Sequence, residues 1–100
     1  MKLIEAVLQQ IKLQEVRNCL YEMGVEDFME SEITCHSHQK GHVRIFRGAE
    51  LVAKIVKKVK LEIIVEDESA EKIIEAIGSI AKGEDREYCR IAIRPYLEVA

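Results

Sequence analysis

The sequence has no tryptophan, a single proline and only three cysteines among its 100 residues. An odd number of cysteines without close spacing argues against a disulfide framework, so we expect Cys19, Cys35 and Cys89 to be reduced thiols. No apolar run approaches the roughly 18 residues of a membrane-spanning helix. The N-terminal stretch, which Glu5 and Gln9 interrupt, is too short for the apolar region of a secretory signal. We therefore expect a cytoplasmic protein that does not insert into membranes.

The chain also lacks an excess of basic residues, with 15 Lys and Arg against 18 Asp and Glu. The net charge is −3, whereas nucleic-acid binding usually needs a strongly basic patch, so we expect no nucleic-acid partner. The hydrophobic share of 48% is ordinary for a globular core, and the length predicts one domain over residues 1–100. A chain of this size buries only about 60–70% of the surface that its unfolded form exposes, so assembly into an oligomer would stabilise it.

Hydrophobic periodicity predicts the elements of the first half. Residues 2–8 are almost continuously apolar, which is typical of a largely buried strand. Apolar residues then recur at steps of three and four, which predicts an amphipathic helix that ends at Gly24. The apolar positions of this helix are Leu13, Val16, Leu20 and Met23. Residues 27–34 predict a second strand around Phe28 and Ile33.

The second half repeats this order. Residues 58–65 alternate between apolar and polar side chains, which predicts a strand with one buried face. Asp67 and Ser69 can cap a second helix. The apolar stripe of this helix consists of Ala70, Ile73, Ile74, Ile77, Ile80 and Ala81. Residues 88–96 predict a last strand, which Pro95 ends or places at a sheet edge.

This order predicts an α+β fold of the ferredoxin-like βαββαβ type, in which a four-stranded antiparallel sheet carries both helices on one face. The uncovered face needs a partner, most simply further copies of the chain. A connection of roughly twenty residues separates the second and third strands, far more than is usual. It contains HQKGHVRIFRGAE, from His38 to Glu50. Because such long loops are often functional, we expect this one to contact a partner.

Three segments of the chain are distinctive. They read MKLIEAVLQQIKLQEVRNCLYEMGV, QKGHVRIFRGAE and KKVKLEIIVEDE. In this order, and without a gap from Met1 to about Ser79, they resemble the nitrogen-regulatory P-II signal-transduction family. The resemblance implies a homotrimer of ferredoxin-like subunits that senses a small metabolite in the clefts between subunits. A long T-loop between strands 2 and 3 would carry the signal to a membrane transporter or a metabolic enzyme.

The resemblance also implies site residues. A site for an adenine nucleotide (ATP, ADP or AMP), for 2-oxoglutarate or for bicarbonate would comprise Val7, His38, Gln39, Lys40, Gly41, Lys58, Glu62 and Arg90. The T-loop residues that meet the partner would be His42, Arg47, Gly48, Glu50, Leu51 and Lys54. The simpler interpretation is that the lysines at the base of the loop are only a solvated basic surface.

The chain departs from the family at its phosphate-binding positions. The family's Gly-rich loop is replaced by GEDREYC, from Gly83, and its three carboxylates repel phosphate. Arg90 stands where the family has a phosphate-binding lysine, and a guanidinium can bind an anion through two hydrogen bonds. His38 replaces an arginine, Leu51 replaces a tyrosine that some members modify with a nucleotide, and the family's basic C-terminal segment would lie beyond Ala100. These departures argue against ordinary ATP binding.

Cys35, His36, His38 and His42 allow a second interpretation. The side chains of His36 and His38 point to the same side of an extended segment, and imidazole and thiolate suit zinc, copper or nickel. The alternative function is therefore a metal-binding P-II-like trimer that uses Cys35, His36 and His38. The simpler interpretation is that these histidines are polar loop residues and that Cys35 is a packing residue.

No catalytic group is apparent in the sequence. Cys35 beside His36 resembles a nucleophile and its base, but adjacent residues of a strand face opposite ways, and no oxyanion donor is evident. We therefore predict that the protein is not an enzyme.

Overall fold

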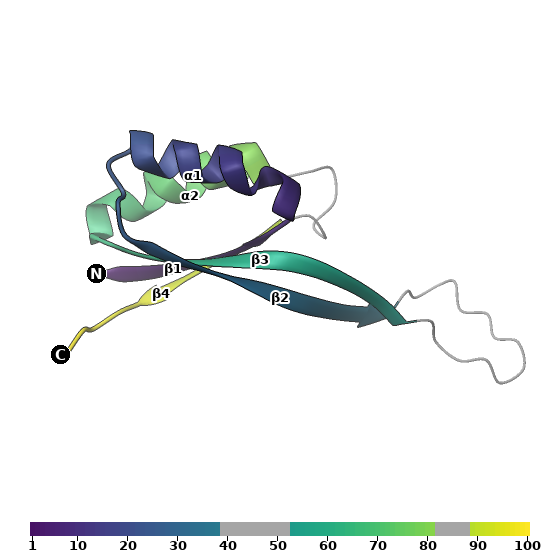
Figure 1. Ribbon diagram of the computed structural model, residues 1–100. Helices are drawn as coiled ribbons and strands as arrows, with labels where there is room; N and C mark the ends of the chain where they lie inside the picture. The colour runs from purple at the N-terminus through teal and green to yellow at the C-terminus, as the bar shows by residue number, and fades with distance from the viewer. Residues whose placement is uncertain (39–52, 82–88) are drawn as a thin grey trace, which may run out of the picture.

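The computed structural model describes residues 1–38, 53–81 and 89–100. The elements are β1 (Lys2–Leu8), a short 3-10 helix η1 (Gln10–Lys12), α1 (Leu13–Glu22), β2 (Phe28–His38), β3 (Ala53–Val65), α2 (Asp67–Ala81) and β4 (Cys89–Pro95). In this described part, the strands form one antiparallel sheet in the order β2-β3-β1-β4, and both helices lie over one of its faces (Figure 1). The predicted ferredoxin-like fold is confirmed.

The core lies between the helices and the sheet. Ile4, Ala6 and Leu8 of β1 are fully buried, because side chains alternate between the two faces of a strand and these three point toward the helices. The other buried residues are Val59, Leu61, Ile63 and Val65 of β3, Val16 and Leu20 of α1, and Ala70, Ile73, Ile77 and Ala81 of α2. Most of the two predicted helical stripes therefore reach the core.

Helix α1 ends at a glycine in the left-handed region. Gly24 has a φ of +85°, which a residue with a Cβ adopts only at a cost. The backbone N–H of Val25 donates to the carbonyl of Leu20 at 2.9 Å, and that of Gly24 donates to the carbonyl of Tyr21 at 3.0 Å. These bonds satisfy carbonyls of the last turn, so the predicted end of the helix is confirmed. Met23, which the pattern assigns to the apolar stripe, instead follows the helix and is exposed.

Strands β2 and β3 are longer than the sequence predicts. The hydrophobic pattern ends the second strand near Thr34 and begins the third at Lys58, whereas the paired strands run to His38 and from Ala53. The extra length forms an arm of two strands that reaches beyond the helices (Figure 1). Backbone pairing rather than burial holds this arm together, and hydrophobic alternation does not report backbone pairing.

The central strand β3 provides a test of this core. Leu61 is fully buried, and its truncation leaves a cavity between sheet and helices. We expect Leu61→Ala to lower the free energy of unfolding by about 2–5 kcal/mol. The control is Ile11→Ala at an 81% exposed position, which we expect to change it by less than about 0.5 kcal/mol. Urea unfolding at one fixed protein concentration measures both, and similar effects of the two variants would contradict the core assignment.

Candidate functional site

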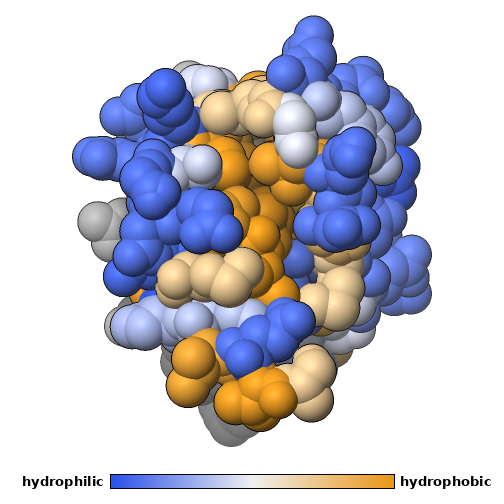
Figure 2. Space-filling model, turned by 90° about the vertical axis from the view of Figure 1, so that its left-hand side faces the viewer, coloured by the Kyte–Doolittle hydropathy of each residue, from blue (hydrophilic) through white to orange (hydrophobic). Residues whose placement is uncertain are grey.

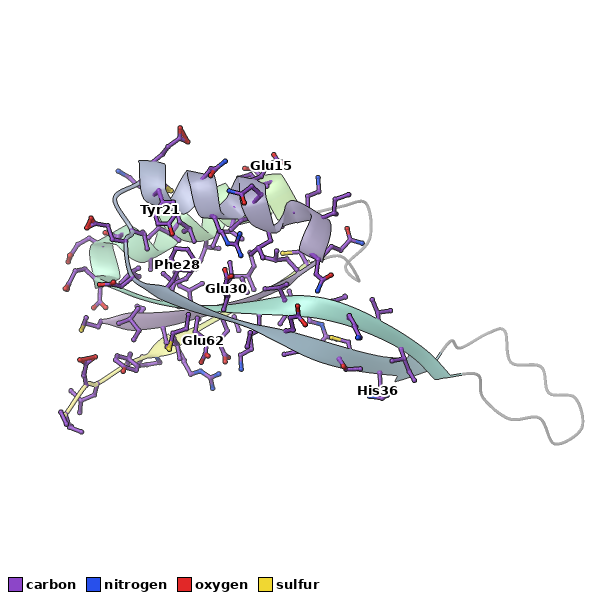
Figure 3. All side chains as sticks on the ribbon, in the orientation of Figure 1. Glu15, Tyr21, Phe28, Glu30, His36 and Glu62 are labelled. Carbon is purple, nitrogen blue, oxygen red and sulfur yellow. The ribbon has the colours of Figure 1, made fainter. Side chains whose placement is uncertain are left out.

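The face of the sheet that points away from the helices carries a dense set of charged side chains, and we call it the open face. Its residues alternate along each strand with those that point toward the helices. They include Leu3, Glu5 and Val7 of β1, Lys58, Lys60, Glu62 and Ile64 of β3, Arg90, Ala92 and Arg94 of β4, and Met29 and Ser31 of β2. Figure 3 shows Glu62 on this side of the sheet and Glu30 on the helix side.

Glu5 is the centre of a charge network on the open face. Its carboxylate forms an ion pair with Lys60 Nζ at 3.3 Å and accepts a hydrogen bond from Arg94 Nη2. Partial desolvation raises the pKa of Glu5, but the hydrogen bonds and charges of Lys60 and Arg94 together outweigh this effect, so the pKa lies below its ordinary value of 4.5. The network therefore links β3, β1 and β4 across the open face.

The register brings several predicted ligand residues to this face. Val7 pairs with Lys60 on one side and with Arg90 on the other, so two cationic residues flank an apolar one. Two residues away from this pair on each strand, Glu62 of β3 pairs with Glu5 of β1. Arg90 is exposed, and among the described residues its side chain has no ion pair or hydrogen bond. Arg90 therefore presents a cation that the described part of the fold does not neutralise.

Lys58 lies within electrostatic range of the start of β4. Burial raises the pKa of the Cys89 thiol, and the charge of Lys58 offsets this effect only in part. Arg90 follows Cys89 directly, so Lys58 and Arg90 belong to the same end of the sheet. Cys89 itself is half-buried against the core, as expected for a boundary residue.

Most of the predicted loop residues lie outside the described part of the chain. These are Gln39, Lys40, Gly41, His42, Arg47, Gly48, Glu50 and Leu51, and the acidic residues that replace the Gly-rich loop lie outside it as well. His38 and Lys54 belong to the outer ends of β2 and β3, where they pair with Ala53 and Ser37. The roles assigned to all of these residues stay predictions.

The described residues include only part of the predicted metal site. Cys35 and His36 are consecutive residues of β2, so their side chains point to opposite sides of the strand. Figure 3 shows His36 on the arm beyond the helices. Among the side chains that the structure describes, in residues 1–36, 55–81 and 89–100, no three His, Cys, Asp or Glu are grouped so as to hold a metal ion. A metal site that uses Cys35, His36 and His38 therefore stays a prediction.

Comparison with known proteins decides the family. Residues 1–95 of this chain match the model of the family described as "Nitrogen regulatory protein P-II". The chain belongs to the P-II family. The resemblance of its three distinctive segments is thereby confirmed, and so is the prediction that it is not an enzyme, because P-II proteins are regulators in signal transduction.

Individual P-II relatives agree with this assignment. The nitrogen regulatory protein P-II of Rhizobium meliloti (strain 1021) is 43% identical over 82 residues, which span 82% of this chain and 73% of the relative. That of Azospirillum brasilense is 42% identical over 81 residues, which span 81% and 72%. Among solved structures, the B. subtilis GlnK–ATP complex superposes with a TM-score of 0.78 over 93% of this chain and 81% of that one. Its sequence identity of 19% supports the fold alone.

The described helices also bear on membrane insertion. Neither α1 nor α2 is long and apolar enough to cross a membrane.

Sequence reasoning missed the role of Glu5. The residue stands out in the sequence only as an interruption of an apolar run. Its partners lie 55 and 89 positions further along the chain, at Lys60 and Arg94. Alternation along β1 alone would have placed Glu5 on the uncovered face, but only the register identifies the cations beside it.

The lowered pKa of Glu5 predicts a pH dependence of stability. Because the carboxylate is favoured in the folded state, its contribution is present above the ordinary value of 4.5 and is lost as the pH falls through the lower folded value. We expect the stability of Glu5→Gln to be lower than that of the wild type at neutral pH and to fall less steeply below pH 4.5.

Urea midpoints measured from about pH 7 down to about pH 3 test this expectation. Glu15→Gln is the matched control, because it removes one carboxylate from the exposed side of α1. Parallel pH profiles for the wild type and Glu5→Gln would show that the network does not stabilise the folded state.

Proposed function

We propose that this P-II protein senses a small anionic metabolite beside Arg90 and signals its presence through the T-loop. The observation that carries the proposal is Arg90 itself, an exposed cation that has no ion pair within the described residues and is paired in register with Val7. A guanidinium binds carboxylate or phosphate through two parallel hydrogen bonds. Lys58, at the same end of the sheet, supplies a second positive charge to the same anion.

The ligand is an adenine nucleotide, a small carboxylate such as 2-oxoglutarate, or bicarbonate. The solved GlnK of B. subtilis is a complex with ATP, which supports a nucleotide. The carboxylate of Glu62 suits the N–H and O–H donors of a nucleoside, because a carboxylate only accepts hydrogen bonds. The three acidic residues at positions 84, 85 and 87 disfavour a long phosphate chain, so we expect AMP or ADP to bind more tightly than ATP.

The signal reaches the partner through the segment between β2 and β3. A ligand shifts the T-loop between two conformations only if it binds one of them more tightly, since equal affinity leaves the balance unchanged. We propose that the residues at the base of this segment, Gln39, Lys40 and Gly41, contact the ligand in one conformation. The remaining T-loop residues, which include Arg47, then bind or release a membrane transporter or a metabolic enzyme in the cytoplasm.

The same proposal includes assembly into a homotrimer through the open face. The helices cover only the other side of the sheet, which leaves apolar side chains on the open face that a subunit contact would bury. Met29 is 55% exposed there, and Leu3, Val7 and Ile64 are only half-buried. Burial of this face compensates for the small core of a short chain.

Ligand binding is tested by calorimetry with ATP, ADP, AMP, 2-oxoglutarate and bicarbonate. We expect Arg90→Ala and Lys58→Ala each to weaken binding of the preferred ligand by about tenfold or more, because each removes a charge-assisted hydrogen bond. Lys57→Ala is the matched control: it removes the same charge one residue away, from a side chain that points to the other side of β3. Equal weakening by Lys57→Ala and Lys58→Ala, or no binding of any ligand by the wild type, would overturn the proposed site.

Assembly is tested separately by light scattering after gel filtration. We expect the wild type to have three times the chain mass of 11.5 kDa. Met29→Lys places a charge on the open face, so we expect it to produce a smaller species while leaving the monomer fold intact. Ile11→Lys, at an 81% exposed position outside the open face, is the control and should remain trimeric. A Met29→Lys protein of unchanged mass would contradict assembly through this face.

A further inference from the structure

A cavity of about 660 Å³ lies at the end of the molecule opposite the β2–β3 arm. We call it the end groove. It is lined by Met23, Gly24, Val25, Glu26, Asp27, Ile64, Val65, Glu66, Glu68, Ser69, Lys72 and Ile73. These residues come from the turn after α1, the end of β3 and the first turns of α2. None of the proposed ligand residues Val7, Lys58, Glu62 and Arg90 lines it.

The end groove has an apolar floor between acidic walls. Val65 and Ile73, which are 8% and 3% exposed, belong to the core and form the floor together with half-buried Val25. Figure 2 views this end of the molecule and shows an apolar band between two hydrophilic sides. One wall carries Glu26 and Asp27. The opposite wall carries Glu66 and Glu68, with Lys72 as its cation.

The four wall carboxylates are exposed and unpaired. Within the part of the chain that the structure describes, the side chains of Glu26, Asp27, Glu66 and Glu68 take part in no ion pair or hydrogen bond. This includes Glu68 and Lys72, although residues four apart on a helix can pair. Glu5 on the open face differs, because Lys60 and Arg94 both pair with it. The groove therefore carries four carboxylates against one lysine, with negative charge on both sides of an apolar floor.

We propose that the end groove binds a basic peptide segment of a partner protein, in which an apolar residue lies between two lysine or arginine residues. In an extended peptide, successive side chains point to opposite sides, so an apolar side chain can enter the floor while its neighbours turn toward the rims. The cations on these neighbours then meet the carboxylates of the two walls, and the long stems of Lys and Arg cover apolar surface. Charge complementarity of this kind both selects a partner and speeds its association.

This surface is distinct from the proposed T-loop signalling route. The β2–β3 arm and the end groove lie at opposite ends of the molecule (Figure 1). A partner held in the groove leaves the arm accessible, so the protein can hold two partners at once. The groove proposal goes beyond the ligand-sensing proposal, and neither depends on the other.

The test uses a fluorescein-labelled peptide of alternating lysine and leucine, titrated with the full-length protein and followed by fluorescence anisotropy. We expect the double variant Asp27→Asn with Glu68→Gln, which removes one carboxylate from each wall, to weaken binding about tenfold. Glu15→Gln with Glu75→Gln is the matched control, because it removes the same charge from exposed helical positions outside the groove. We expect that variant to weaken binding less than about twofold.

Three results would overturn the proposal. The first is that the wild type does not bind the peptide. The second is that the control variant weakens binding as much as the groove variant, which would mean that binding follows net charge alone. The third result has two parts: spermidine displaces the peptide, and a peptide with serine in place of leucine binds equally well. Together they would assign the groove to a small polyamine. Methyl NMR signals of Val25 and Ile73 that shift on peptide addition would locate binding at the floor.

Discussion

The register of β1 against its two neighbours is the constraint on which the rest of the structure depends. β1 is paired along both edges, with β3 and with β4, so its alternation sets which side chains of three strands face the helices. Ile4 and Leu8 complete the core, whereas Glu5 and Val7 face away from it. A shift by one residue would bury Glu5 and expose Ile4, which neither the core nor the charge network would tolerate.

The same constraint separates two chemically different surfaces. On the open face, positive charge exceeds negative charge at the end where Arg90 and Lys58 belong, and Glu5 holds the middle of the face together. At the opposite end of β3, four carboxylates lie around Val65 and Ile73 with Lys72 as the one cation among the described lining residues, and the structure shows no ion pair between them. The described residues of this chain, whose net charge is −3, therefore carry local charges of opposite sign at the two ends of the sheet.

Much of the fold could be predicted from the sequence because a buried face of a helix or strand gives a periodic pattern of apolar residues. The apolar stripe of α2 and the alternation of residues 59–65 report a side that must be hidden from water, and both matched the structure. The outer parts of β2 and β3 left no such trace, since backbone hydrogen bonds hold an exposed arm whatever its side chains are. The metal interpretation stays a prediction for a related reason: Cys35 and His36 alternate along an exposed strand, and no burial pattern indicates which side chains meet there.

By itself, the sequence determined the elements, their order and the family, because these depend on local periodicity and on segments that can be compared residue by residue. It also predicted Arg90 and Lys58 as residues of an anion site. Only the tertiary structure decided which distant charges meet, such as Glu5 with Arg94, and which carboxylates remain unpaired around the end groove. The physical reason is that an ion pair depends on distance in space, and the register of the sheet, rather than the spacing along the chain, sets that distance.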